Sequence, residues 1–352
     1  MPIEICIRGA GPVGCALALL LHSAGREIRL VEKKPPPGNA QLRPIALSHA
    51  SRLILERVCA WGMLPATPIR TIRISQQGGF GRVCLSAEES GVPALGYVVD
   101  YQSLVDCLHS RIEECGIRTA SEAQDALLVV HAEGASSEFK EKDYAQEAVV
   151  ALVTTDPAAD ATAWERFTPQ GPLALLPMDG RYCAVWGMRP ERASMLCAAT
   201  EAEFLQALAS AFGRRAGDFV AVDARNRVPL ALRVRPSRIG ERRAYVGNAA
   251  QMLHPVAGQG LNLGLRDAWD LAQVLHAAPD PGDASVLGRF AQMRRMDATA
   301  SIRITDFLAG AFLGANPVAG LMRGFGLTAL DICLPARRFF ARRMIYGTSA
   351  MP

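Results

Sequence analysis

The start of the chain alternates between apolar and polar positions in a way that predicts a strand, a helix and a second strand. Ile3, Ile5 and Ile7 have the two-residue period of a half-buried strand. Residues 15–25, CALALLLHSAG, are apolar until Gly25, which predicts a helix that ends at a glycine. Residues 27–32, EIRLVE, return to a strand pattern that ends at Glu32.

Helical and strand-like patterns continue along the rest of the chain. Residues 45–64 and 101–116 carry apolar side chains at helical spacing, so each predicts a helix. Short strands are predicted in residues 69–86, 125–135 and 167–188, and another strand within residues 233–251 leads into a glycine turn. Most of the chain after this turn reads as helix.

This order predicts an α/β protein whose Rossmann-type nucleotide-binding domain is assembled from separate pieces of the chain. We expect residues 1–66, 99–136 and 230–300 to form that domain. Residues 67–98 and 137–229 are expected to form an inserted, mostly β substrate domain, and residues 301–352 a helical C-terminal region.

Composition narrows the class of protein. The 352 residues carry 38 Lys and Arg against 34 Asp and Glu, a net charge of +4 that does not favour a nucleic-acid partner. Nine cysteines and six histidines are scattered without CxxC pairs, so neither a zinc site nor a disulfide framework is predicted.

The location expected from the sequence is cytoplasmic, or peripheral to the inner membrane. The chain enters a strand pattern at once, which does not fit a signal peptide. Its apolar runs fall short of the roughly 18–20 residues that a membrane-spanning helix needs.

The first glycine turn has the pattern of a dinucleotide-binding loop. Gly9-x-Gly11-x-x-Gly14 follows the first strand and opens the first helix. Gly9 would permit the tight turn, Gly11 would let the backbone approach a pyrophosphate, and Gly14 would let helix and strand pack closely. Glu32, at the end of the second strand, could accept hydrogen bonds from a ribose. This segment alone leaves FAD and NAD open.

A second glycine turn lies far along the chain, in the segment GNAAQMLHPVAGQGLNLGLRD from Gly247 to Asp267. A strand precedes it and a helix follows Gly260, so its backbone could also approach an anionic ligand. Two such turns can serve the two ends of one long ligand. This favours FAD over a nicotinamide as the resident cofactor.

The combination resembles the class A flavoprotein monooxygenases, which have the para-hydroxybenzoate hydroxylase-like fold. Within that group, the Gly247–Asp267 segment, residues 164–177 (WERFTPQGPLALLP) and residues 329–343 (ALDICLPARRFFARR) resemble the ubiquinone-biosynthesis hydroxylases. The resemblance covers essentially the whole chain. It implies an FAD enzyme that NAD(P)H reduces and that uses O2 to hydroxylate the aromatic ring of a polyprenyl phenol.

The resemblance also implies a set of cofactor-binding positions. They comprise the first glycine turn and the acid that follows the second strand, an arginine and a glutamine near the flavin, an acid–glycine pair after the buried strand, and the second glycine turn. These residues are Gly9, Gly11, Pro12, Val13, Gly14, Glu32, Lys33, Arg43, Gln102, Glu133, Gly134, Gly247, Asn248, Gly258, Gln259, Gly260, Leu261 and Asn262.

His254 and Pro255 are the candidate catalytic residues, because the resemblance puts their turn beside the flavin ring. An imidazole there could relay the phenolic proton of the substrate, since its ordinary pKa suits proton transfer near neutrality. Alternatively, His254 holds the turn through a backbone hydrogen bond.

The chain departs from the broad family in three places. Asn248 stands where an aspartate is usual, although the ubiquinone branch often has asparagine, and Glu133 stands where an aspartate is usual. Several strands that relatives carry before residue 125 are missing. A trimmed peripheral sheet is one explanation. The other is a catalytically weakened FAD-binding accessory or scaffold protein of the same pathway.

The C-terminal region is apolar and ends in a cluster of arginines and phenylalanines at residues 337–343. One interpretation is an amphipathic element that contacts a membrane surface or a biosynthetic complex, which would suit a lipid-dissolved substrate. The other is a set of core helices with a basic exposed face.

Overall fold

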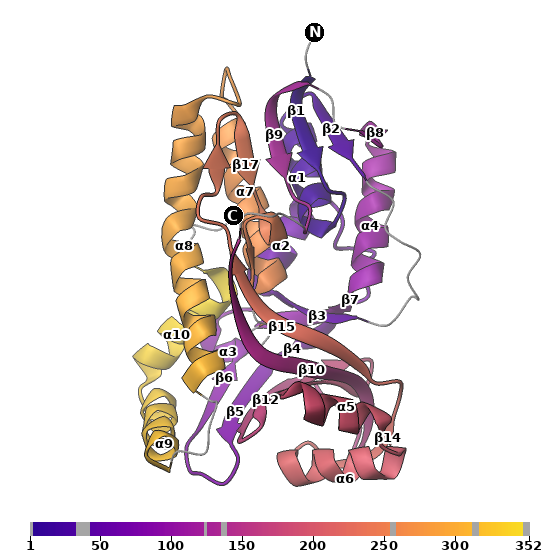
Figure 1. Cartoon of the computed structure of the whole chain (residues 1–352), viewed down its shortest axis with the longest axis vertical. Helices are drawn as coiled ribbons and strands as arrows, with labels where there is room; N and C mark the ends of the chain where they lie inside the picture. Colours follow the sequence, from indigo (N-terminus) through magenta and orange to yellow (C-terminus); the bar gives the residue numbers. More distant parts are fainter. Residues whose placement is uncertain are drawn as a thin grey trace.

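A computed structural model of the chain describes residues 3–32, 43–122, 125–134, 139–253, 258–311 and 317–347, with the backbone alone for residues 301–311 and 317–319. The predicted α/β class is confirmed. A six-stranded sheet with its helices forms the upper half of the molecule, and a nine-stranded sheet the lower half (Figure 1). A three-stranded sheet lies between them.

The six-stranded sheet has the strand order β16-β17-β9-β1-β2-β8. Strand β1 pairs in parallel with β2 and β9, β2 with β8, and β9 with β17. Only the short β16 runs antiparallel. The strands are β1 (Ile3–Arg8), β2 (Ile28–Val31), β8 (Thr119–Ala120), β9 (Ala126–His131), β16 (Ile239–Gly240) and β17 (Arg243–Tyr245).

Helices pack around this sheet. The apolar run after the first glycine turn forms α1 (Pro12–Ser23), in which every residue from Pro12 to Leu21 is buried. Helix α1 packs against α4 (Tyr101–Glu114) and α7 (Gly260–Leu275), and α7 packs against the long α8 (Ala284–Ala311). A helix apolar on all sides must be buried on all sides, which accounts for the central place of α1.

The nine-stranded sheet has the order β18-β15-β10-β13-β12-β11-β5-β6, with β14 paired to β10. Helices α5 (Pro190–Ala198) and α6 (Glu201–Phe212) cover one face, and we call the opposite face the inner face. The strands are β5 (Thr71–Gln76), β6 (Arg82–Ser86), β10 (Lys140–Asp156), β11 (Thr162–Thr168), β12 (Gly171–Met178), β13 (Arg181–Met188), β14 (Asp218–Val222), β15 (Asn226–Val234) and β18 (Gln251–Met252).

The small sheet corrects one prediction. Residues 45–64 were expected to form one helix, but β3 (Pro44–Ser48) pairs with β7 (Gly96–Asp100), which also pairs with β4 (Thr67–Ile69). Helix α2 (His49–Arg57) begins only after Ser48, whose hydroxyl accepts a hydrogen bond from the Ser51 backbone N–H. The N-cap serine therefore divides the segment.

The C-terminal region is helical, as predicted. Helices α9 (Pro317–Ile332) and α10 (Leu334–Tyr346) pack with β5, β6 and the single-turn α3 (Ala87–Ser90). Among the helices that the structure describes, none combines the length and apolarity needed to cross a membrane. The nine cysteines are free thiols.

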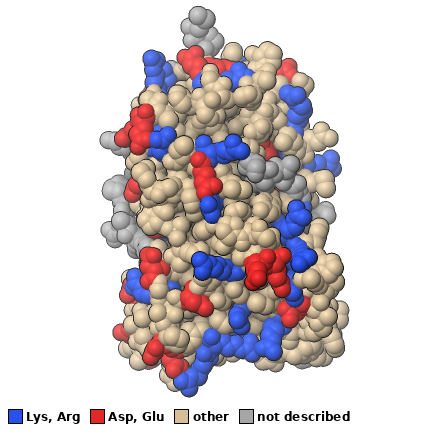
Figure 2. Space-filling view, turned by 180° about the vertical axis from the view of Figure 1, so that it is seen from behind, with Lys and Arg blue, Asp and Glu red and all other residues tan. Residues whose placement is uncertain are grey.

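Acidic and basic side chains are interspersed over most of the face shown in Figure 2, with basic side chains gathered toward its lower end. The division into domains at residues 66, 98, 136, 229 and 300 remains our proposal.

Candidate functional site

Four parallel strands of the six-stranded sheet end at one edge. Strands β17, β9, β1 and β2 are neighbours in that order, so the residues that follow them gather at their carboxyl ends. Gly247, Glu133, Gly9 and Glu32 follow these strands. Four of the predicted cofactor-binding residues, far apart in the sequence, are thus brought to the edge where open α/β sheets bind ligands.

The first turn is closed by backbone contacts that only glycine permits. Gly9 has a φ of +110°, and a Cβ atom there would lie 2.8 Å from the backbone of Ala132 and Glu133. A Cβ on Gly14 would lie 1.9 Å from the carbonyl oxygen of Gly9. Helix α1 therefore starts directly against β1, with Pro12 in its first turn and Gly11 as its N-cap.

The second turn lies against the first. Gly247 has a φ of +58°, and a Cβ there would lie 3.1 Å from the Val13 side chain. A Cβ on Gly264, in α7, would lie 2.7 Å from Val13 and 3.0 Å from Gly247 Cα. Gly134 and Asn248 are also neighbours, at 4.0 Å between the Cβ positions. Two glycine turns more than two hundred residues apart thus lie against each other and form one continuous backbone surface.

Helix α4 brings its N-terminal residues to the same surface. A Cβ on Gly11 would lie 3.8 Å from the Tyr101 hydroxyl, and the Arg43 guanidinium lies 4.7 Å from the centre of the Tyr101 ring. Burial raises the pKa of Tyr101, although Arg43 opposes the shift. Gln102 is exposed beside them and donates a hydrogen bond to Asp106, 2.8 Å away.

Glu133 interacts with a stacked aromatic pair. Its carboxylate lies 3.3 Å from Nδ1 of His131, whose ring stacks on Tyr245 at 4.9 Å and 15°. The Arg235 guanidinium lies 3.6 Å from the centre of the Tyr245 ring. Burial lowers the pKa of His131, and the Glu133 carboxylate opposes this shift. The imidazole is therefore neutral at neutral pH.

The Gly258–Asn262 turn opens the sixteen-residue helix α7. Gly258 has a φ of +57°, and a Cβ there would lie 3.5 Å from Ala46 of β3. Gln259 is the N-cap, and Gly260 and Leu261 begin the helix. The first N–H groups of a helix have no partner within the helix and carry partial positive charge, so they favour an anionic or electron-rich ligand edge.

Asn262 uses its whole side chain inside the protein. Its Nδ2 group donates to the carbonyl oxygens of Ala46 and Gly258, at 2.9 and 2.8 Å. Its Oδ1 atom accepts from the Ser48 backbone N–H and the Ser51 hydroxyl, at 2.8 and 2.7 Å. The amide has no further capacity for a ligand. Its role is to fix the start of α7 against β3 and α2.

A buried ion network, centred on Asp267 and Arg294, holds the second turn in place. Asp267 Oδ2 accepts from the Gly247 backbone N–H at 3.1 Å and from Gln251 at 2.9 Å, while Oδ1 accepts from Arg294 at 2.7 Å and from Arg238 at 3.2 Å. Arg294 continues to two further aspartates on α7 and α8, Asp270 and Asp297. A single carboxylate thus anchors both the turn and its helix.

The balance of forces on Asp267 favours its charged form. Burial alone would raise the pKa of this carboxyl group, but Arg238 and Arg294, with the hydrogen bond from Gln251, bring the pKa below its usual value. Arg294 stays protonated because the aspartates around it raise its pKa against the effect of burial.

Three predicted residues lie outside the described part of the chain: Lys33, His254 and Pro255. Their proposed roles stay predictions.

Sequence reasoning missed Tyr101, His131 and Asp267 as parts of the site. Asp267 is the last residue of the Gly247–Asp267 segment, five positions after Asn262. Its role depends on partners such as Arg294, which lie outside that segment and which the sequence pattern does not indicate. Tyr101 directly precedes Gln102, at the start of a predicted helix that follows a strand. That position was the available signal.

The backbone surface formed by the two glycine turns fits a dinucleotide with a diphosphate. Gly9, Gly14 and Gly247 have no side chains, so the backbone of both turns is open to a ligand. The N-terminus of α1 supplies N–H groups that can bind a phosphate. The acid Glu32 follows β2 at the same edge, where a ribose hydroxyl would meet it.

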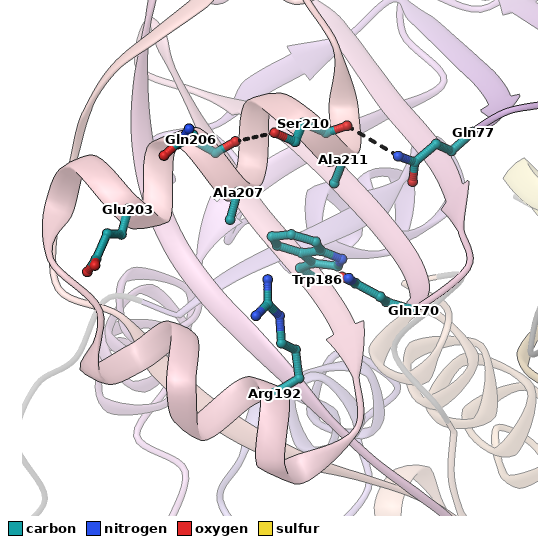
Figure 3. Close-up of a pocket in the computed structure, with 9 residues that line it drawn as sticks. All are labelled: Gln77, Gln170, Trp186, Arg192, Glu203, Gln206, Ala207, Ser210 and Ala211. Carbon is teal, nitrogen blue, oxygen red and sulfur yellow. Dashed lines mark hydrogen bonds between the residues drawn. The ribbon is translucent and has the colours of Figure 1, made fainter.

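The pocket in Figure 3 is a separate feature. It has a volume of about 330 Å³ and lies between α6 and the nine-stranded sheet, with Trp186, Arg192 and Ala207 in its lining. None of the predicted site residues lines it.

Known proteins are similar to this chain over most of its length. The FAD binding domain family matches residues 122–305. Ubiquinone hydroxylase UbiL of Rhodospirillum rubrum is 30% identical, over 96% of this chain and 88% of its own. The 3-demethoxyubiquinol 3-hydroxylase of Escherichia coli is 30% identical, over 94% of this chain and 95% of its own.

The fold is also that of a solved monooxygenase. The structure of p-nitrophenol 4-monooxygenase PnpA from Pseudomonas putida superimposes with a TM-score of 0.79, at 17% identity, over 99% of this chain and 100% of that chain. The alignment with UbiL runs over 380 positions, more than the 352 residues of this chain, so that relative has segments that this chain lacks.

We predict that Gly14→Ala removes FAD binding. The added Cβ would lie 1.9 Å from the Gly9 carbonyl oxygen, so α1 must move away from β1. We expect a loss of about 2 kcal/mol or more in the free energy of unfolding and a protein purified without flavin absorbance. The matched control is Gly288→Ala in α8, where a Cβ meets nothing within 4 Å. Retention of flavin by Gly14→Ala would contradict the packing argument.

We predict that Asp267→Asn destabilises the fold by about 3–5 kcal/mol at neutral pH, because Arg238 and Arg294 would lose a buried partner. The pKa of Asp267 is lower in the folded protein than in the unfolded chain, where it is about 3.9. The contribution of Asp267 to the free energy of unfolding is therefore present above the unfolded pKa and is lost as the pH falls through the folded pKa. Urea unfolding at pH 7 and at pH 3 tests this. The difference between wild type and variant should shrink at pH 3. The exposed pair Asp280–Arg242 provides a control, Asp280→Asn, which should change stability little.

Proposed function

This chain belongs to the FAD binding domain family and is a flavin-dependent aromatic monooxygenase, and we propose that it hydroxylates a polyprenyl phenol intermediate of ubiquinone biosynthesis with NAD(P)H and O2. The substrate class rests on the two relatives named for ubiquinone chemistry, each 30% identical over nearly the whole chain. The single structural observation that supports it is the contact of the two glycine turns across Val13. One extended cofactor can occupy both.

In this proposal the backbone and side chains of the protein bind FAD and orient it. The backbone at Gly9, Gly11 and Gly247 contacts the diphosphate, and Glu32 accepts hydrogen bonds from the adenosine ribose. The N-terminus of α7, at Gly260 and Leu261, faces the electron-rich edge of the ring system and stabilises negative charge there. FAD, when bound, supplies the redox and oxygen chemistry.

His254 and Pro255 are proposed to lie beside the ring. There the imidazole of His254 would accept the phenolic proton as the aromatic ring becomes more electron-rich. His131, held neutral by burial and stacked on Tyr245, lies by contrast at the edge of the sheet near Glu133.

The alternative is an FAD-binding accessory protein without turnover. The segments of UbiL that this chain lacks and the glutamate at position 133 favour this alternative. It predicts flavin binding without substrate-stimulated oxidation of NAD(P)H.

We also propose that α9 and α10 dock on an anionic lipid surface. Met322, Phe325 and Ile332 follow helical spacing on α9 and are 70%, 65% and 77% exposed. On α10, Phe339 is 73% exposed and lies between the exposed Arg338 and Arg342. The only acid in these two helices, Asp331, accepts a hydrogen bond from the Cys84 N–H. The apolar stripe on α9, together with the exposed arginines of the adjoining α10, suits anionic headgroups.

We predict that the FAD-loaded protein oxidises NAD(P)H about tenfold faster or more with a short-chain 2-prenylphenol than with its methyl ether, because only the phenol activates the ring. Isotopically labelled O2 should add one labelled oxygen atom to the product, as measured by mass spectrometry. Gly14→Ala is the control for flavin dependence. A yellow protein with unstimulated oxidation would support the accessory alternative instead.

We predict that the double variant Met322→Asp/Ile332→Asp no longer co-sediments with vesicles containing phosphatidylglycerol, because two charges would enter the apolar stripe. Wild type should bind these vesicles more than vesicles of phosphatidylcholine alone. Met195→Asp, on α5, is the control, since Met195 is also exposed, at 62%, but α5 packs on β10 and β15, whereas α9 packs on β5 and β6 toward the opposite edge of the sheet. Equal sedimentation of the double variant and the wild type would contradict lipid docking. So would a wild-type protein that is dimeric and a double variant that is monomeric, because the apolar stripe would then be a contact between two copies of the chain.

A further inference from the structure

Strand β11 places its side chains alternately on the two faces of the nine-stranded sheet. Trp164 contacts Tyr182 and Phe212 on the helix-covered face, and Arg166 donates to the Ala211 carbonyl oxygen of α6 at 3.0 Å. Glu165, between them, therefore lies on the inner face.

The strand register shows what surrounds Glu165. It is opposite Ile74 of β5 on one side and Ala174 of β12 on the other. The same row continues through Val185 of β13 to Val150 of β10. Both valines pack with the apolar cluster that β4 and β7 form against this face. The carboxyl group is thus set in a row of apolar side chains.

The Glu165 carboxyl group is not fully satisfied by the part of the chain that the structure describes. Its Oε1 atom is buried without a hydrogen bond among the described residues, yet the residue as a whole retains partial solvent exposure. Removal from water, the only cause of the shift, raises the pKa of the carboxyl group to about 8. An unpaired polar group in an apolar interior costs free energy, so a purely structural role would be better served by an apolar residue.

The inner face is also the face that adjoins the second glycine turn. The three-stranded sheet that packs on the inner face includes β3, to which Asn262 binds at the start of α7. An aromatic ring held between the turn and the sheet would therefore contact inner-face side chains.

We propose that Glu165 recognises the phenolic oxygen of the aromatic substrate by a direct hydrogen bond. This inference rests on the proposed function, because it needs a phenol at the site. A neutral carboxyl group donates such a bond to the phenolic oxygen without burying a charge, and it leaves the single hydroxyl proton of the phenol to His254. Glu165 lies in the WERFTPQGPLALLP segment, to which the cofactor site gives no other role.

The neighbours of Glu165 do not themselves titrate between about pH 7 and 9, so a change in binding over that range can be assigned to Glu165. Ile74 and Ala174, on either side, do not titrate. Of the other ionisable groups on this face among the described side chains, Cys183 stays a thiol because burial raises its pKa to about 12, and Arg323 of α9 is directed to Gln76 on β5. A pH response between about 7 and 9 would thus report Glu165 itself.

The test compares binding of 2-methoxyphenol and 1,2-dimethoxybenzene to the FAD-loaded protein by calorimetry. We expect wild type to prefer the phenol by about tenfold, Glu165→Ala to lose the preference, and Glu165→Gln, which keeps a donor and an acceptor, to retain much of it. Glu141→Gln, which removes an exposed carboxylate paired with Arg233, is the matched control and should behave as wild type.

The pH dependence separates direct contact from a structural role. As the pH rises from 7 to 9, the Glu165 carboxyl loses its donor proton, so the wild-type preference should fall. The preference of Glu165→Gln should stay constant over that range. Glu165→Ala should melt at the wild-type temperature or above.

Three results would overturn the proposal: an unchanged preference in Glu165→Ala, no preference in wild type, or unfolding of both Glu165 variants. A preserved preference for the phenol in wild type without any hydroxylated product would contradict the proposed function alone.

Discussion

The carboxylate of Asp267 is the single group on which the arrangement of the site depends. It accepts the N–H of Gly247 and pairs with Arg238 and Arg294, so one buried charge links the second glycine turn, helix α7 and helix α8. Two ions removed from water are favourable only when their geometry and hydrogen bonds are complete. The network therefore admits one relative position of the turn and its helix.

The glycines of the two turns also fix the arrangement of the site, because they let neighbouring segments approach closely. Val13 of α1 reaches both Gly247 and Gly264, which lie so close that a methyl group on Gly264 would overlap Val13. The two glycine turns are consequently fixed to each other by van der Waals contact as well as by the ions behind them. A cofactor that binds both turns meets a surface that is already formed, which reduces the entropic cost of binding.

The sequence was informative where the determinants were local. The glycine spacing at Gly9–Gly14, the strand before it and the acid at Glu32 predicted a βαβ unit, and the structure has one. The prediction of one helix over residues 45–64 was wrong because Ile45 and Leu47 pair with β7, a strand fifty residues away. The partners of Asp267 and Asn262 and the apolar surroundings of Glu165 were equally invisible, since each is set by packing between segments distant in the chain. Whether the predicted site residues touch FAD stays a prediction.

The four hydrogen bonds of the Asn262 amide also carry a consequence for how the chain folds. They join residues separated by 211 to 216 positions, apart from the local bond to Gly258. Contacts of such long sequence separation form late, because closing the intervening loop costs entropy before any contact is gained. During synthesis, the segment around Ser48 and Ser51 emerges long before its partner, and its final docking must wait until the ribosome has passed residue 262.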